Sequence, residues 1–518
     1  MLARALTLRL TAAALGALAL VVPGCSLGNV SQDDCESNEQ CVQAFGAGSR
    51  CEEGYCTEGG ECVTGHDCRA IFGGGACVEG KCTDSLPTDP ACTVVEPENL
   101  YERAATGDEA RLIFGGIFSN DFPFDEALTT AVRLAVQEFN RSGGGIDGKE
   151  FGVVFCDNGG PGNEAEGDER AALNRHALDY LAGTLGVPFI VGPLSSSDAT
   201  TLIGHETEKG YPTVIISPSA TSPSLTTASD RLAETDPFGM FWRTCPSDEL
   251  QGAVLGGLMG DDELIQKAAV LYLQDVYGEG LAFVVQENFP RTTQLVPFAP
   301  INMGDDLTPY RDQLLDIDPD AIVIIAVQAT DTIALMETMV GTALLEKKFF
   351  FTDGSKDKTI MLTEAPADLK AVINASLGTA PAQPVGGNYR LFATNLEAAF
   401  DITASGFAFL AHAYDAAYIG AFGTLYAQSL RPDYDGRLVA EGLSHMIQGT
   451  EVSILPTQWS AGKNAMTKGD RTMNVEGISG PLDFNVDTGE APGPIEVWKV
   501  NAAGTDFETD HIVQPSAI

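Results

Sequence analysis

The chain has 518 residues, too many for one ordinary domain, and its composition is that of a globular protein with enough apolar residues for a core. Its 72 acidic side chains outnumber 30 basic ones and give a formal net charge of −42. A surface with this charge repels phosphate backbones, which argues against nucleic acid as a partner.

The first residues, 1–24, have the order of an export signal. Arg4 and Arg9 precede an apolar run over residues 12–22, and Val22-Pro23-Gly24 forms a small-residue cleavage site. The apolar run is too short to span a bilayer. We therefore expect residues 1–24 to be removed on export.

Cys25 follows this cleavage site directly. The segment resembles the lipobox of bacterial lipoproteins, in which the new N-terminal cysteine carries the lipid; a plain secretory signal with an unmodified Cys25 is the alternative. No later apolar run approaches the ~20 residues needed to cross a bilayer, so we expect lipid to be the only membrane anchor. Residues 25–34 would then form a tether.

The twelve cysteines of the chain fit an oxidising compartment. Eight of them form two similar repeats with few large apolar residues, so two disulfides per repeat would replace a core, with their pairing left open. The repeats comprise Cys35, Cys41, Cys51 and Cys56, then Cys62, Cys68, Cys77 and Cys82. Cys-x2-Cys spacing is missing, which argues against zinc. Once Cys25 is assigned to lipid, Cys92, Cys156 and Cys245 remain, an odd number, so one is free or pairs outside the chain.

We expect residues 35–92 to form a disulfide-rich stalk and residues 93–108 an acidic linker. Acids greatly outnumber bases here, so the stalk would stay solvated and hold the main domain away from the membrane.

From residue 109 onward, continuous apolar runs alternate with helical stretches. Strands are predicted at residues 111–117, 151–155, 188–191, 212–216, 268–273 and 321–327, with a helix around 128–139. Continuous apolar strands interleaved with helices indicate buried parallel sheets of the α/β class. About 400 residues exceed one sheet's usual size, so we expect two lobes.

Two of these strands run into hydroxyl-rich loops, at residues 192–197 and 217–222. Hydroxyls and free backbone N–H groups at the carboxyl ends of parallel strands, beside helix starts, form a ready site for a carboxylate. The sequence therefore predicts a site that holds a small polar ligand.

No catalytic or metal-binding pattern emerges. Gly143-x4-Gly148-Lys149 matches most of a phosphate-loop pattern, but Glu150 follows it and the segment lies between a helix and a strand, so we interpret it as a turn. The six histidines are scattered, and no serine or cysteine has a histidine at recognisable spacing. We therefore expect no enzymatic activity, no cofactor and no metal; an exported amide hydrolase is the enzymatic alternative.

Eight short motifs occur in the order of a known family. Over about residues 110–500 the chain resembles the type I periplasmic-binding-protein fold, specifically the solute-binding lipoproteins of branched-chain amino-acid ABC transporters. The motifs are Phe139-Asn140-x2-Gly143-Gly144-Gly145-Ile146-Asp147-Gly148, Val191-Gly192-Pro193-x-Ser195-Ser196, Ser217-Pro218-x-Ala220-Thr221, Arg243-Thr244-x-Pro246-Ser247-Asp248, Tyr277-Gly278, Thr352-Asp353-Gly354, Ala413-Tyr414-Asp415-Ala416 and Gly477-Ile478-Ser479-Gly480-x2-Asp483-Phe484.

The resemblance implies two Rossmann-like lobes with parallel sheets, joined by a three-crossover hinge, with the ligand between them. The crossovers would lie near residues 243–244, 377–378 and 471–480. The first lobe would comprise residues 109–243 and 379–470, and the second residues 244–378 and 471–506.

The resemblance also implies binding roles for particular residues. Ser196, with its neighbour Ser195, and the segment Ser219, Ala220 and Thr221 would grip a ligand carboxylate. Asp353 would hold an α-ammonium, and Tyr277 would be the first aromatic contact.

The chain departs from the family pattern in the expected side-chain pocket. Gln328 stands where relatives that bind leucine-like ligands have a tyrosine, which weakens the expectation of an aliphatic ligand. Phe122 and Phe124 are candidates for this pocket, with packing as the alternative role.

We thus expect a lipid-anchored receptor of the bacterial cell envelope, periplasmic or outer-surface, that captures an amino acid or similar solute and delivers it to an ABC permease. The alternative is a ligand-sensing module that signals through a partner protein, since a fold alone does not decide function.

Overall fold

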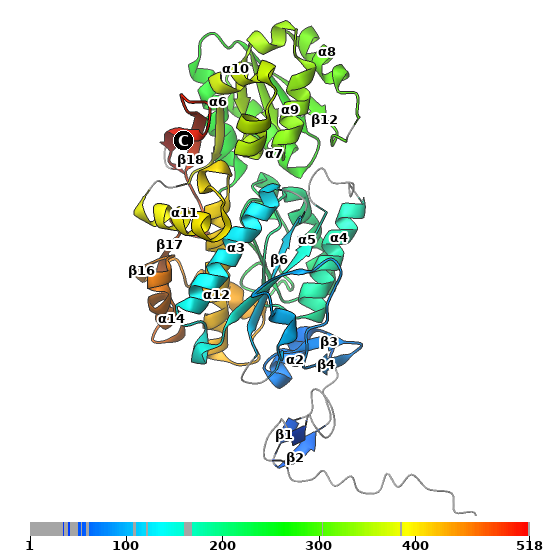
Figure 1. Cartoon of the computed structure of the whole chain (residues 1–518), viewed down its shortest axis with the longest axis vertical. Coiled ribbons are helices and arrows are strands. Elements are labelled where there is room, and N and C mark those ends of the chain that lie inside the picture. The colour runs from blue at the N-terminus through cyan, green and yellow to red at the C-terminus, as the bar shows by residue number, and fades with distance from the viewer. Residues whose placement is uncertain are drawn as a thin grey trace, which may run out of the picture. The chain divides into compact units, whose positions relative to one another are not determined.

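The structure is a computed structural model (Figure 1). It describes residues 35, 40–41, 50–52, 54–57, 62–106, 110–120, 123–159, 168–302, 304–383 and 386–515. The export signal, Cys25 and the tether lie outside the described residues. In the part of the chain that is described, no helix has both the length and the apolar character needed to cross a membrane. The chain divides into two compact units, residues 1–59 and 60–518.

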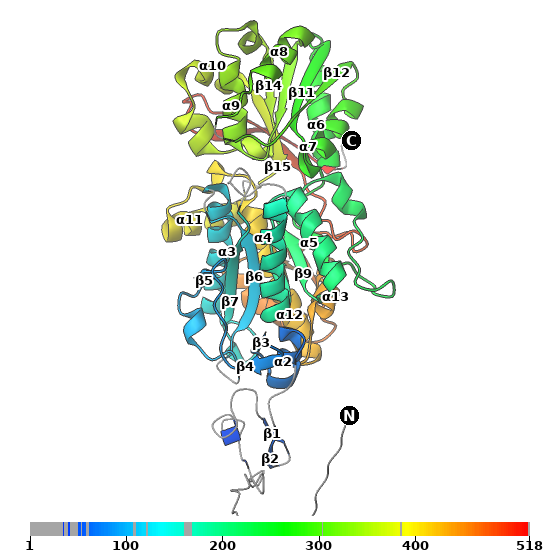
Figure 2. The same ribbon diagram turned by 90° about the vertical axis from the view of Figure 1, so that its right-hand side faces the viewer.

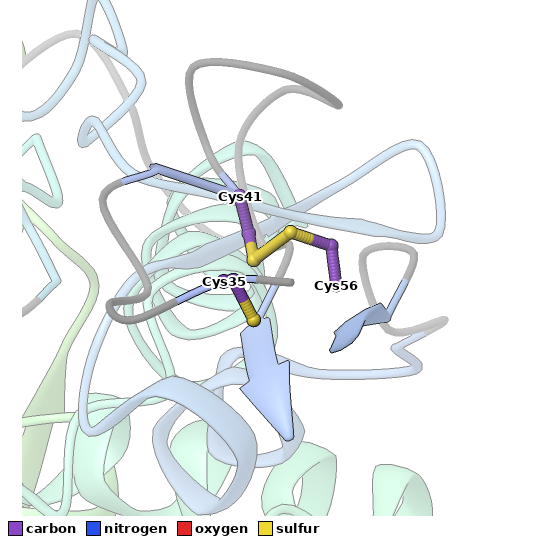
Figure 3. A group of neighbouring side chains, drawn as sticks. All are labelled: Cys35, Cys41 and Cys56. Carbon is purple, nitrogen blue, oxygen red and sulfur yellow. A yellow bond between two sulfur atoms is a disulfide. The ribbon is translucent and has the colours of Figure 1, made fainter. Parts of the chain in front are cut away.

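The first unit contains the first cysteine repeat. Its hairpin of β1 (Arg50–Glu52) and β2 (Tyr55–Thr57) is held by the disulfides Cys35–Cys51 and Cys41–Cys56. Figure 3 shows Cys35 close to the Cys41–Cys56 disulfide. Because these cysteines are oxidised, they offer no thiolate to a metal.

The second repeat belongs to the second unit. The boundary between the units therefore lies at residues 59–60, whereas the expected stalk ends at residue 92. It contains α2 (Gly65–Phe72), β3 (Ala76–Val78) and β4 (Lys81–Thr83), with disulfides Cys62–Cys77 and Cys68–Cys82. Both repeats therefore pair their first cysteine with the third and the second with the fourth.

Contacts with the first lobe explain this placement of the second repeat. Arg69 donates to the carbonyl oxygens of Gly186 and Tyr434, and His66 Nε2 lies 3.2 Å from Thr213 Oγ1. Ala76 and Leu86 are buried in a core cluster of that lobe. A repeat with few apolar residues of its own thus buries them against the lobe.

The expected linker also packs onto the first lobe. β5 (Val94–Glu96) is an antiparallel edge strand of its sheet, η1 (Leu100–Glu102) follows, and Cys92 forms a disulfide with Cys156. Cys245 is the buried free cysteine of the described residues.

The first lobe is built on a six-stranded sheet with the order β10-β9-β8-β6-β7-β5, parallel except for β5. Its parallel strands are β6 (Leu112–Phe118), β7 (Phe151–Asp157), β8 (Phe189–Val191), β9 (Val214–Ser217) and β10 (Phe241–Arg243). Strands β6, β7, β8 and β9 confirm the predicted runs, and apolar residues cover both faces of the sheet.

Helices from distant parts of the sequence cover the first sheet (Figures 1 and 2). One face is packed by α3 (Pro123–Arg141), α11 (Gly387–Phe400), α12 (Leu410–Leu430), α13 (Gly436–Ser444) and α14 (Trp459–Thr467). The other face is packed by α4 (Asp168–Leu178), α5 (Ser196–Lys209) and the second cysteine repeat.

The second lobe has a seven-stranded sheet in the order β12-β11-β13-β14-β15-β18-β19, of which the last two are antiparallel. The strands are β11 (Lys267–Leu273), β12 (Thr292–Phe298), β13 (Ala321–Ile325), β14 (Lys348–Phe351), β15 (Leu377–Pro381), β18 (Ile495–Val500) and β19 (Phe507–Val513). Its helices are α6 (Asp248–Asp261), α7 (Val276–Asn288), α8 (Thr308–Ile317), α9 (Ala329–Thr338) and α10 (Ala367–Ala375).

Short helical segments and one small sheet complete the fold. The segments are η2 (Ile146–Gly148), η3 (Asp179–Thr184), η4 (Pro223–Thr227), η5 (Ala343–Glu346), η6 (Asp353–Ser355), η7 (Thr359–Glu364), η8 (Ala404–Gly406) and η9 (Pro456–Gln458). The sheet pairs β16 (Thr450–Ser453) with β17 (Met473–Glu476).

The chain crosses between the lobes three times. It leaves the first lobe after β10, returns after β15, and enters the second lobe again between Ala491 and β18, later than the expected segment 471–480. Asp415 of α12 holds this later segment in the first lobe: it accepts hydrogen bonds from Ile478 N (2.9 Å), Ser479 N (2.8 Å) and Ser479 Oγ (2.6 Å). The fold is thus α/β with two mostly parallel sheets, as predicted.

Candidate functional site

The carboxyl ends of strands from both lobes meet at one interface. In the first lobe, β8 leads to α5, whose N-cap is Ser195, and β9 leads to the loop that contains Ser219. In the second lobe, β13 and β14 lead to Val327 and Asp353. Figure 2 shows the upper ends of α4 and α5 facing α7 of the second lobe.

A small cavity of about 20 Å³ lies between these strand ends. It is lined by Phe124, Leu194, Ser195, Ser196, Ser219, Tyr277, Val327, Asp353, Gly354 and Phe409. Five of the eight sequence-predicted site residues are brought together here: Ser195, Ser196, Ser219, Tyr277 and Asp353. This volume suits about one water molecule, so the lobes are closed on each other in this structure.

Asp353 is the acidic group of the cavity. Its Oδ1 accepts hydrogen bonds from Gln251 Nε2 (2.6 Å) and from the Tyr277 hydroxyl (2.8 Å). Burial raises the pKa of Asp353, and these two hydrogen bonds act against that shift. The neighbouring Gly354 lets the backbone pass closely, because a Cβ there would overlap the carbonyl oxygen of Ala326.

The serines form the opposite wall. Ser195 Oγ accepts from Asp198 N at 3.1 Å and donates to Asp198 Oδ2 at 2.7 Å, which caps α5. Ser219 Oγ donates to the carbonyl oxygen of Leu194 at 2.9 Å, and Ser196 Oγ accepts from Ser222 N at 3.1 Å. These bonds fix the hydroxyls at the N-terminal end of α5, where the helix dipole favours negative charge.

Thr221 and Ala220 do not line this cavity. The Thr221 hydroxyl donates to Asp248 Oδ2 at 2.8 Å, and Asp248 N donates to the Thr221 carbonyl at 2.8 Å. Ala220 N donates to Ser217 Oγ at 2.9 Å, and its carbonyl accepts from Arg243. Both residues thus brace the loop from behind.

Asp248 and Gln251 are residues that the sequence analysis gave no role. Burial and the neighbouring Asp353 raise the pKa of Asp248 well above its usual value. Asp248 is the last residue of the motif Arg243-Thr244-x-Pro246-Ser247-Asp248, so the resemblance to the family could have marked it as a candidate site residue. Gln251 lies one helical turn further on and carries no comparable signal.

Two aromatic rings close the cavity from the first lobe. Phe124 and Phe409 have ring centroids 6.5 Å apart. Phe409 has a φ of 64°, a left-handed conformation that is costly for a bulky residue and that is found preferentially at functional sites. Phe122 lies outside the described residues. No sequence pattern marks Phe409.

Gln328 lies in a second cavity, of about 260 Å³, that shares Ser195 and Val327 with the first. Of the sequence-predicted site residues, Gln328 therefore shares its cavity with Ser195 alone.

The first cavity offers hydroxyls, a helix N-terminus and one buried carboxylate. The ten residues that line it include no histidine, lysine or cysteine. Two lobes closed on such a cavity define a solute-binding protein.

Comparisons with known proteins agree with this class. The family model for the receptor family ligand binding region matches residues 127–503, and the chain belongs to that family. A chemotactic signal transduction system substrate-binding protein, BasB of Halobacterium salinarum, is 26% identical over 358 residues, 68% of this chain and 77% of that protein.

A binding protein for leucine, isoleucine, valine, threonine and alanine from Pseudomonas aeruginosa is 27% identical over 174 residues, 33% of this chain and 41% of that protein. The crystal structure of the leucine-binding protein LivK from Thermotoga maritima superimposes with a TM-score of 0.59 at 17% identity, covering 79% of this chain and all of that one. The fold is therefore that of type I periplasmic binding proteins, and the chain is a binding protein and not an enzyme.

Proposed function

We propose that this protein is a solute-binding lipoprotein of the bacterial cell envelope that captures an amino acid or similar small polar solute and delivers it to an ABC permease. The single observation that carries the proposal is the position of Asp353 in the same cavity as the serines at the start of α5. One wall suits an ammonium group and the opposite wall suits a carboxylate. A zwitterion matches both.

The assignment of groups follows from the contacts. Asp353 would hold the α-ammonium, with Tyr277 and Gln251 orienting its carboxylate. The Ser196 hydroxyl and the backbone N–H groups at the start of α5 would hold the α-carboxylate. The Ser195 and Ser219 hydroxyls already donate to Asp198 and Leu194, so these two residues would shape that wall, while Ala220 and Thr221 support the loop. The amino-acid ligands named for the relatives are consistent with this proposal.

A thermal-shift screen of the purified protein across amino acids, amides and small carboxylates tests the proposal. A ligand at 100 times its dissociation constant adds ~2.7 kcal/mol to stability, which is a measurable rise in melting temperature. Failure of every amino acid to raise the melting temperature would reject amino-acid capture.

A sensory role is the second candidate, because one relative is a substrate-binding protein of a chemotactic signal transduction system. A pull-down from the membranes of the source cells, with the ligand-loaded protein as bait, separates the two roles. Recovery of an ABC permease supports transport, and recovery of a transducer instead supports sensing.

Membrane attachment through lipid on Cys25 is part of the proposal. Cys25→Ser is expected to release the protein from the membrane fraction into the soluble fraction. Continued membrane attachment of the variant would exclude the lipid anchor.

A further inference from the structure

The second cavity opens beside the first and is an order of magnitude larger. Its volume is about 260 Å³, against about 20 Å³ for the first cavity. Its walls come from both lobes: the starts of α4 and α5 on one side, and the starts of α7 and α9 on the other. Because the first cavity has room for about one water molecule, an α-amino-acid group between Asp353 and the serines requires the lobes to lie further apart. The side chain of such a ligand would then extend past Ser195 and Val327, which line both cavities, toward the second cavity.

The charges on these walls do not balance. The charged lining residues are Arg170, Asp198, Asp275 and Asp331, one positive and three negative, which gives a formal charge of −2. The Asp331 carboxylate lies in the first turn of α9. A partly closed cleft with this charge favours a positively charged occupant.

The positive charge of Arg170 does not neutralise Asp275 or Asp331, because the Arg170 guanidinium is already paired with Asp198. Arg170 Nε donates to Asp198 Oδ1 at 2.8 Å, and its Nη2 is paired with Oδ2. Asn174 Nδ2 and Ser195 Oγ also donate to Asp198, at 2.8 Å and 2.7 Å. The Arg170–Asp198 pair is thus an internally neutral unit of the first lobe, and the negative charges of Asp275 and Asp331 remain.

Asp275 has hydrogen-bond donors but no cation in direct contact among the described residues. Its Oδ1 accepts from Gly278 N at 2.7 Å, and its Oδ2 accepts from Ser197 Oγ at 3.3 Å across the lobe interface. A carboxylate with only neutral donors in a partly closed cleft keeps a strong electrostatic preference for a cation.

Gln328 supplies an independent indication of a polar ligand. Its side chain lines the second cavity although the residue is only 6% exposed. The recorded hydrogen bond of this amide joins Oε1 to Thr330 Oγ1 at 3.2 Å, and the other amide atom has no partner among the described residues. Because the amide can rotate by 180°, it can present either N–H or C=O to the cavity, which suits a polar group of a ligand.

We propose that the second cavity binds the cationic end of an extended amino-acid side chain, a guanidinium or an ammonium, against Asp275, Asp331 and the amide of Gln328. This inference rests on the proposed function, because it takes the α-amino-acid group to lie in the first cavity. A distal carboxylate is disfavoured by the −2 charge, and an aliphatic side chain leaves the polar atoms unpaired.

Titration calorimetry with arginine, citrulline, leucine and glutamate tests the proposal. Citrulline has nearly the shape of arginine without its charge, so it isolates the charge. Arginine is expected to bind at least tenfold more tightly than citrulline, and more tightly than leucine or glutamate. Equal affinity for arginine and citrulline, or tighter binding of leucine or glutamate, overturns the inference.

Substitutions test whether the difference in affinity between arginine and citrulline arises in the second cavity. Asp275→Asn keeps an N-cap residue on α7 and is expected to weaken arginine binding tenfold or more while changing citrulline binding by less than threefold. Asp318→Asn makes the same substitution at an exposed position of the same lobe and is expected to change neither. Unchanged arginine affinity in Asp275→Asn contradicts the inference.

The outcomes separate this inference from the function on which it rests. Binding of leucine without arginine keeps amino-acid capture and rejects the cationic subsite. Binding of none of these four amino acids rejects the cationic subsite, whereas amino-acid capture itself is rejected only if every amino acid fails in the thermal-shift screen.

Discussion

The carboxylate of Asp353 is the group whose removal tests the binding site most directly. Its Oδ1 is occupied by Gln251 (2.6 Å) and Tyr277 (2.8 Å), so an ammonium would approach Oδ2. A hydrogen bond to a charged group contributes ~1.5–3 kcal/mol, which corresponds to roughly ten- to 150-fold in affinity.

Asp353→Asn is expected to reach the upper part of this range. The carbonyl oxygen of the asparagine must face the Gln251 and Tyr277 donors, so its NH2 group takes the place of Oδ2. A donor then faces the ammonium of the ligand, and affinity for an amino acid falls about a hundredfold.

The ligand-free variant is expected to remain stable. Because burial raises the pKa of Asp353, the ionised carboxylate is unfavourable in the folded protein at pH 7, and the neutral amide does not lower stability. The melting temperature without ligand should stay the same or rise, while the ligand-induced rise is lost.

Calorimetry with the amino acid found in the screen, and with its 2-hydroxy acid analogue, provides the measurement. The analogue lacks the ammonium, so its affinity should change little in Asp353→Asn. Asp318→Asn serves as the matched control. Wild-type affinity of Asp353→Asn for the amino acid would refute the reasoning.

Three further predictions concern neighbouring features. Thr221→Ala removes the hydroxyl donor of the buried Asp248 and is expected to lower the free energy of unfolding by about 1–3 kcal/mol in urea titration, with less than a tenfold loss of affinity by calorimetry. Leu86→Ala is expected to destabilise the second unit, residues 60–518, by about 2–5 kcal/mol in scanning calorimetry. If residues 35–92 formed a detached stalk, the substitution would leave the melting transition of the two lobes unchanged. Burial raises the pKa of Asp275 to about 6, with Arg170 and Asp198 nearby, so its contribution to stability is present below about pH 4 and lost as pH rises through 6. A pH series of melting temperatures should lose this dependence in Asp275→Asn.

The second cysteine repeat shows why the domain boundary could not be predicted from the sequence. The sparse apolar residues of the repeat correctly indicated that it has no core of its own. Whether such a repeat stands free or packs on a neighbour depends on a complementary surface, here at Gly186 and Thr213. Those residues lie more than a hundred positions away, and nothing local links them to the repeat.

The third crossover lies later in the chain than the expected segment 471–480, for a similar reason. The motif around Ile478 and Ser479 was visible, but its partner Asp415 is brought to it only by the packing of α12. A loop whose backbone N–H groups are bound by a buried carboxylate stays with the lobe that carries the carboxylate.

Sequence alone determined the elements whose cause is local. Continuous apolar runs specified the parallel strands, and hydroxyl residues after β8 and β9 specified a polar loop at their carboxyl ends, because strand burial and helix capping depend on neighbouring residues. Closure of the two lobes decided which side chains share a cavity. It placed Asp353 with the serines, turned Thr221 toward Asp248 and put Gln328 in the larger cavity, since these contacts join residues on different lobes and depend on packing that no local pattern encodes.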